Sequence, residues 1–123
     1  MHVAVTSRCL GDLPFLDACS LLADYGYTRI EFWFDENGDH LKPSEVVADV
    51  EGFITRFRAA SRLTPVAFCF EQPIEIETFR EMTRLAKLMR VAQITVPSTP
   101  LGTPFNAEIE RLQELLQFSS AAG

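Results

Sequence analysis

Two glutamates and a tryptophan are the side chains of this sequence best placed to do chemistry. Glu31 and Trp33 lie two residues apart in an alternating segment, and Glu71 directly follows another apolar segment. Side chains two apart in a strand share one face, so Glu31 and Trp33 should point the same way. A carboxylate accepts hydrogen bonds from hydroxyl groups, and an indole can cover the apolar carbons of a ligand. The three residues are therefore candidates for binding a small substrate.

Each of these residues also has a structural interpretation. Glu31 could instead be a structural partner for Arg29 or for another interior base, because a buried charge must be paired. Trp33, like Phe34 beside it, could serve packing, and Glu71 could be a solvated acid in a loop. One carboxylate with neither a visible metal nor a paired acid is a thin basis for general-base catalysis. We therefore assign no catalytic residue.

An acidic turn at residues 35–40 begins like a calcium-binding EF-hand loop. Oxygen-bearing side chains alternate along it, namely Asp35, Asn37 and Asp39. The pattern then fails, because the sixth position is His40 rather than Gly and the twelfth is Val46 rather than Glu. The segment is expected to be a solvated turn, and His2 and His40 are too isolated to form a zinc site. No metal site or cofactor is expected within the chain.

Four β-prone segments alternate with segments whose apolar residues recur at helical spacing. The expected strands are residues 3–6, 28–34, 65–70 and 92–96. The expected helices start at Pro14, at Pro43, near Ile74 or Glu75, and at Asn106 as an N-cap. Gly26 should end the first helix, and one apolar stripe should run along the second as far as Phe57. Strands separated by helices predict an α/β fold with parallel crossovers.

This periodicity allows a small doubly wound sheet or part of a barrel. Arg29, Glu31 and Trp33 on one face suit the layered, partly polar interior of a barrel. The loops after the second and fourth strands are long, and barrels build their sites on such loops. Because a (β/α)8 TIM barrel needs ~250 residues, residues 1–123 are predicted to form four βα units, its N-terminal half. Such a half exposes two strand edges and should self-associate or pair with the missing half.

The composition restricts the class of protein. A net charge of −6, from 17 acidic and 11 basic residues, argues against nucleic-acid binding. Cys9, Cys19 and Cys69 are odd in number and lack CxxC spacing, so they are expected to be reduced, with Cys9 in the core. No apolar run approaches the ~18 residues of a membrane span. A soluble cytoplasmic protein with no membrane partner is expected.

Several local motifs point to a known family. They are the strand at residues 3–6, Asp17-Ala18 through Gly26-Tyr27, Ile30-Glu31-Phe32, and Ile94-Thr95-Val96-Pro97 before a long loop. Together they resemble the N-terminal half of the xylose isomerase-like TIM-barrel superfamily, the sugar phosphate isomerases and epimerases. The segment from Gly26 to Glu31 is the most specific, since it is similar to the family's Gly-x-x-x-(Val/Ile)-Glu-(Leu/Phe) pattern. The residues Pro97-Ser98-Thr99-Pro100 depart from the family's small-residue ending of strand four.

The resemblance implies isomerisation or epimerisation of a small carbohydrate, assisted by a divalent metal (Mn, Mg or Zn). The family's metal ligands, typically two Glu, an Asp and a His, come from strands five to eight, so none is assigned here. The chain alone is expected to show no turnover in an isomerase assay with Mn²⁺ or Mg²⁺. The alternative is a complete noncatalytic doubly wound module for binding or assembly. A nuclease of the same superfamily acting on abasic DNA is disfavoured by the acidic charge.

Overall fold

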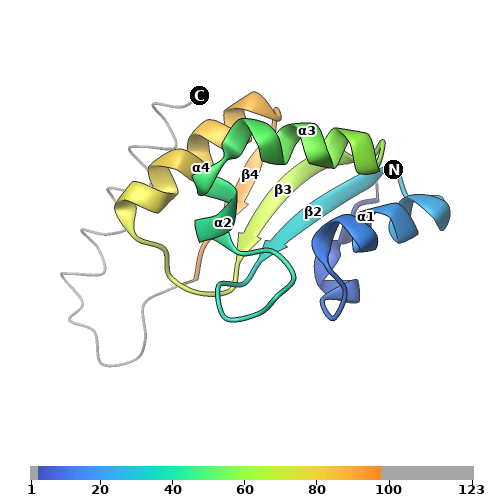
Figure 1. Cartoon of the computed structure of the whole chain (residues 1–123), viewed down its shortest axis with the longest axis horizontal. Helices are drawn as coiled ribbons and strands as arrows, with labels where there is room; N and C mark the ends of the chain where they lie inside the picture. The colour runs from blue at the N-terminus through green and yellow to red at the C-terminus, as the bar shows by residue number, and fades with distance from the viewer. Residues whose placement is uncertain (1–2, 98–123) are drawn as a thin grey trace.

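Strands alternate with helices in the computed structural model of the chain, which describes residues 3–97 (Figure 1). The elements, in chain order, are β1 (Val5–Thr6), the 3-10 helix η1 (Ser7–Leu10), α1 (Phe15–Asp24), β2 (Arg29–Phe34), α2 (Pro43–Ala48), α3 (Val50–Ala60), β3 (Thr64–Phe70), α4 (Ile76–Leu88) and β4 (Gln93–Thr95). The helix expected after Asn106, and most of the loop before it, lie outside the described residues.

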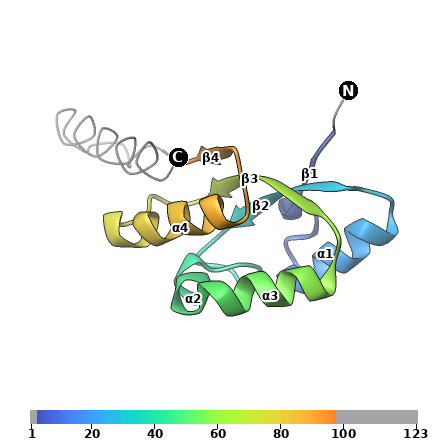
Figure 2. The ribbon, with the colours of Figure 1, turned by 90° about the horizontal axis from the view of Figure 1, so that it is seen from above.

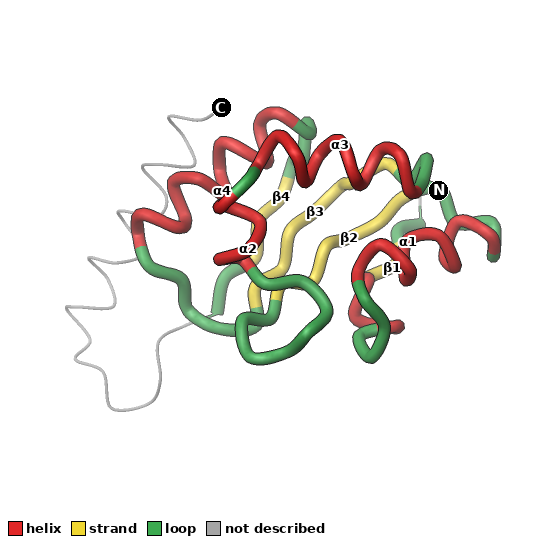
Figure 3. The backbone as a smooth tube through the Cα atoms, in the orientation of Figure 1, coloured by secondary structure: helices red, strands yellow, loops and turns green. Residues whose placement is uncertain are grey.

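The four strands form one parallel sheet. Their order across the sheet is the order in the sequence, β1-β2-β3-β4. Helices α1, α3 and α4 lie on the same side of this sheet (Figure 2). The loops that leave β2 and β3 lie at one end of it (Figure 3). The predicted α/β class and parallel crossovers are therefore confirmed.

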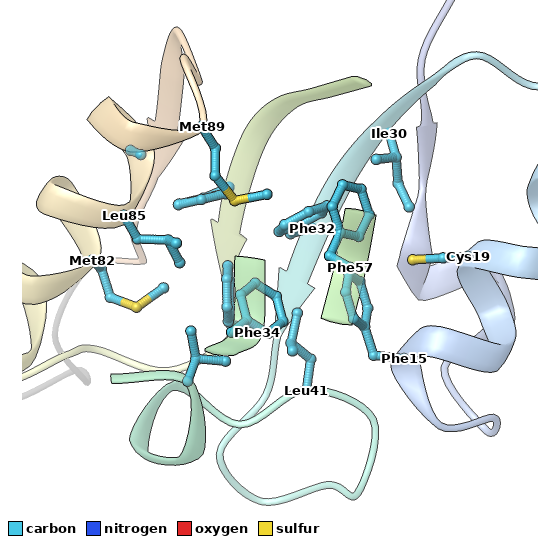
Figure 4. Close-up of a cluster of buried hydrophobic side chains, with 14 of the residues drawn as sticks. Phe15, Cys19, Ile30, Phe32, Phe34, Leu41, Phe57, Met82, Leu85 and Met89 are labelled. Atoms are coloured by element: carbon cyan, nitrogen blue, oxygen red, sulfur yellow. The ribbon is translucent and has the colours of Figure 1, made fainter. Parts of the chain in front are cut away.

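The core lies between the sheet and the helices. Every second residue of β2 is fully buried, namely Ile30, Phe32 and Phe34. The ring of Phe32 contacts rings from α1, α3 and β3, with centroids 4.9 Å from Phe15, 5.0 Å from Phe57 and 5.4 Å from Phe68 (Figure 4). Burying one such side chain contributes about 1.5–3 kcal/mol, so this aromatic cluster holds the helices to β2.

A β-bulge between β2 and β3 determines which side chains are in register on the face of the sheet opposite the helices. Ile30 pairs with Pro65, but Glu31 pairs with Ala67, so Val66 is the extra residue. Proline has no N–H to give to the strand ladder, which suits this position. Beyond the bulge two rows cross the sheet in register. One contains Thr6, Glu31, Ala67 and Gln93, and the next contains Trp33, Cys69 and Thr95.

The predicted second helix is wrong in one respect, because it is divided at Asp49. This residue has non-helical torsion angles (φ −153°, ψ 75°), and its carboxylate accepts a hydrogen bond of 3.1 Å from the backbone N–H of Gly52. An aspartate that satisfies a free N–H starts a new helix there, even though the apolar stripe continues through it. In contrast, α1 ends as predicted at Gly26, whose φ of +96° favours glycine.

The outer strands are shorter than the sequence predicts. The described β1 has two residues and β4 has three, so Val3 and Ala92 fall outside them. Over the described part of the chain, no helix is both long enough and apolar enough to cross a bilayer.

Candidate functional site

Two of the three predicted site residues are in direct contact. The indole Nε1 of Trp33 donates a hydrogen bond of 3.0 Å to Oε2 of Glu71, although the residues are 38 positions apart. Trp33 lies near the end of β2, and Glu71 directly follows β3. The backbone N–H of Glu71 donates to the carbonyl of Phe34 at 2.9 Å, which extends the pairing of the two strands. The carboxyl ends of neighbouring parallel strands therefore bring these residues together.

Arg8 joins this pair, and it was not among the predicted residues. Its guanidinium carbon lies 5.3 Å from the centroid of the Trp33 ring, and its Nη1 lies 3.7 Å from Oε2 of Glu71. The side chains of Arg8 and Glu71 are 63% and 41% exposed, so the ion pair itself contributes little to stability. Arg8 follows β1 by two residues, as Glu71 follows β3 by one. That shared position at strand ends is the signal that could have identified it.

The indole of Trp33 is held from several sides. Its backbone N–H donates to Oγ of the buried Ser7 at 2.9 Å. A Cβ atom at Gly11 would lie 2.9 Å from Cζ3 of the indole, so a side chain there would displace the ring. The ring of His40 lies 5.9 Å away, tilted by 37°. Trp33 therefore packs against these residues while its Nε1 orients Glu71, and its role in binding a substrate stays a prediction.

Glu31 lies on the same face, one row deeper than Trp33. Its register partners are Thr6 on β1 and Ala67 on β3. The side chain is partly buried. Among residues 3–97 it makes no side-chain hydrogen bond or ion pair, so the alternative pairing with Arg29 is not observed. Its carboxylate is therefore available to a hydrogen-bond donor.

The thiol of Cys69 reports on the charge of this site. Burial raises the pKa of Cys69, and the carboxylates of Glu31 and Glu71 raise it further, while Arg8 lowers it by a smaller effect. A raised pKa favours the protonated form of this thiol at neutral pH. The two carboxylates affect the thiol more than Arg8 does, so negative charge dominates the electrostatic environment of Cys69.

A network of side chains joins the loops that leave β2 and β3. The amide of Gln72 donates to Oδ1 of Asp35, and its Oε1 accepts a hydrogen bond of 2.9 Å from the N–H of Glu36. The carboxylate of Glu36 in turn accepts from the N–H of Ser44 at 3.1 Å, at the start of α2. The expectation of a solvated turn at residues 35–40 is therefore wrong in part. The segment is tied to its neighbours, and His40 at its end is only 5% exposed.

The cysteines differ in their surroundings, and all three are free thiols. Cys19 is fully buried in α1, and burial raises its pKa to about 12. Cys9 is exposed, so its predicted place in the core is wrong. The reason is that the chain enters η1 directly after β1, and Ser7 rather than Cys9 takes the buried position.

The described residues do not form a metal centre. Between residues 3 and 97 no three His, Cys, Asp or Glu side chains come close enough to share an ion. What the site offers is two carboxylates, one of them held by Trp33 and Arg8, around a protonated thiol. Such groups can bind hydroxyl or cationic donors. No known protein-family model matches the chain, and no curated protein matches its sequence.

Proposed function

We propose that the four strands and their helices are successive units of a (β/α)8-type barrel. Two features of the fold support this. The strands follow one another in sequence order, and helices α1, α3 and α4 lie on one side of the sheet (Figure 2). Right-handed crossovers that continue in one direction place all helices outside a curved sheet, as in a barrel. A doubly wound sheet instead reverses its strand order and carries helices on both faces.

The proposed ligand of this barrel is a small carbohydrate at the carboxyl ends of the strands. The observation that carries this proposal is the contact of Trp33 with Glu71, beside Arg8, where parallel strands end. Barrel enzymes place their sites at that end. Sugar hydroxyls donate to carboxylates and accept from guanidinium groups, so Glu31, Glu71 and Arg8 supply complementary partners. The proposed role of these residues is to bind and orient the ligand.

The reaction proposed for the complete barrel is the isomerisation or epimerisation that the family resemblance implies. In that family a divalent metal takes part. The residues described here do not fit a metal, because no three ligand side chains converge. No step of the reaction is therefore assigned to this chain. Its contribution in the proposal is the substrate-binding wall formed by Glu31, Trp33 and Glu71.

The test is a titration of the chain with D-glucose, D-fructose and the phosphate ester of D-fructose, followed by NMR. A bound sugar should shift the indole N–H resonance of Trp33, which is the only tryptophan. Glu31→Gln and Glu71→Gln should each weaken binding. Glu77→Gln is the matched control, since it removes the same charge from an exposed site on α4. If Glu31→Gln and Glu71→Gln bind as Glu77→Gln does, or if no sugar gives a shift, the noncatalytic binding or assembly module is favoured.

A further inference from the structure

Negative charge predominates in the wall proposed to bind a carbohydrate. The wall contains the carboxylates of Glu31 and Glu71, and the guanidinium of Arg8 lies beside them. Nη1 of Arg8 is 3.7 Å from Oε2 of Glu71, so this positive charge already faces a carboxylate. Arg29 shares a face of β2 with Glu31, but it lies at the start of the strand, the end opposite Glu71. A group that binds near Trp33 therefore meets more negative charge than positive.

A cavity of about 450 Å³ beside Trp33 adds further carboxylates to this end of the sheet. Three of them line it, those of Asp12, Asp35 and Asp39, and among its described lining residues Arg8 is the only lysine or arginine. Because Trp33 and Arg8 belong to the cavity and to the proposed sugar site alike, a ligand of that site is exposed to all these charges. A cleft with one predominant sign of charge repels ions of the same sign.

The thiol of Cys69 reports the same balance from within the sheet. Cys69 is in register with Trp33, and it senses the carboxylates of Glu31 and Glu71 more strongly than it senses Arg8. The carboxylates of the cavity are not among the groups that act on it. The negative charge of the wall is therefore independent of the negative charge of the cavity.

The helices that follow β1 and β3 do not offset this charge. Phosphate groups are often bound at helix starts, where free backbone N–H groups and the helix dipole favour an anion. In α1 and α4 the first turn carries an acidic side chain, Asp17 and Glu77 respectively, and no basic one. These carboxylates oppose a second anion at the same positions.

From these observations we infer that the proposed site accepts an unphosphorylated sugar and rejects the phosphate ester of that sugar. A free sugar is uncharged, and its hydroxyls can donate to Glu31 and Glu71. A phosphate ester carries a charge of about −1.5 to −2 at neutral pH, and its phosphate oxygens chiefly accept hydrogen bonds. The ester therefore meets repulsion where the free sugar finds partners. The inference deepens the proposed function and rests on it, because it names the class of sugar for the same site.

The test compares D-fructose with its terminal phosphate ester, followed by the indole N–H resonance of Trp33, the only tryptophan. D-Fructose should bind at least about fivefold more tightly, the effect of one unfavourable charge contact at an exposed site. Added salt should narrow this difference, since it screens charge. Equal or tighter binding of the ester, or a difference that salt leaves unchanged, overturns the inference while the carbohydrate site stands. No shift with either compound overturns the proposed function itself.

Variants outside the sugar-binding wall test whether charge causes the discrimination. Asp12→Asn and Asp39→Asn should each tighten binding of the ester by about two- to fivefold, and each should leave D-fructose binding unchanged. Asp24→Asn is the matched control, because it makes the same change at a surface pocket beside Thr28 and Leu63, where β2 and β3 begin. It should alter binding of neither compound. If the Asp12 and Asp39 variants bind the ester as the control does, the inference fails.

Discussion

At the scale of single residues, the site depends on charges that act on one another. The carboxylate of Glu71 is held by the indole of Trp33 and faces the guanidinium of Arg8. Glu31 has no such partner among the described residues. Both carboxylates raise the pKa of Cys69, and Arg8 opposes them. The thiol therefore offers a chemical probe of the site.

The reactivity of Cys69 should follow these charges. In Glu71→Gln the pKa of the thiol should fall, so a larger fraction is thiolate at a given pH and alkylation should be roughly two- to tenfold faster. Arg8→Gln should slow it, since a positive charge is removed. Peptide-resolved mass spectrometry after iodoacetamide treatment at mildly alkaline pH measures the rate, with exposed Cys9 as the internal reference. Equal rates in both variants and in Glu77→Gln would contradict this account of the site.

At the scale of elements, the start of α2 and the loop after β3 hold the loop after β2. Because α2 ends before Asp49, it is a short separate helix whose Ser44 binds Glu36. Gln72, in the loop after β3, binds the neighbouring Asp35. The two loops are thus tied together next to Glu71, and this tie supports the position of the carboxylate.

The stability of the protein should depend on the side chain that caps the start of α3. Asp49→Ala removes the acceptor of the Gly52 N–H and the ion pair of 3.7 Å with Arg56, and should lower the free energy of unfolding by about 1 kcal/mol. Asp49→Asn keeps an efficient cap and should cost much less. Urea unfolding followed by circular dichroism measures both. The assigned cap would be wrong if the two variants lost the same stability.

The free energy of unfolding should be far more sensitive to substitutions at the centre of β2. Phe32 is fully buried and contacts aromatic rings from α1, α3 and β3. Phe32→Ala should lower the free energy of unfolding by about 3–5 kcal/mol, through lost burial and a residual cavity. Phe32→Leu fills most of that volume and should cost less than half as much. A urea midpoint for the alanine variant close to that of the unchanged protein would refute the assigned core.

At the scale of the whole molecule, the sheet has two outer strands. The described β1 and β4 each pair on one side within residues 3–97, and Gln93 and Thr95 of β4 are exposed. Strand edges of this kind favour pairing with a further strand. We propose that the chain associates with a second copy, or with further βα units of the same barrel type.

Self-association is expected to increase with concentration. Sedimentation velocity should show a shift from monomer towards dimer as the chain is concentrated. Gln93→Lys places a charge on the outer strand and should weaken the dimer, since lysine on an edge opposes pairing. Asp24→Asn, at the end of α1, should leave it unchanged. A monomer at every concentration would exclude the second copy as the partner.

The sequence by itself determined the elements and their inward faces. The alternation of β2 separated Ile30, Phe32 and Phe34 from Glu31 and Trp33, and the structure confirms that division. Such patterns are readable because burial repeats every second residue in a strand and every three to four in a helix. Glu31, Trp33 and Glu71 could be selected in the same way, since each stands at or beside a predicted strand.

Only the tertiary structure decided which of these side chains meet. Trp33 reaches Glu71 across 38 residues, and Arg8 completes the group from a third segment. These contacts depend on the register of the strands and on the packing of loops, which local patterns do not encode. The burial of His40 and the exposure of Cys9 have the same origin, because both follow from how the chain turns after a strand. Periodicity fixes which face a residue occupies, whereas three-dimensional packing fixes its neighbours.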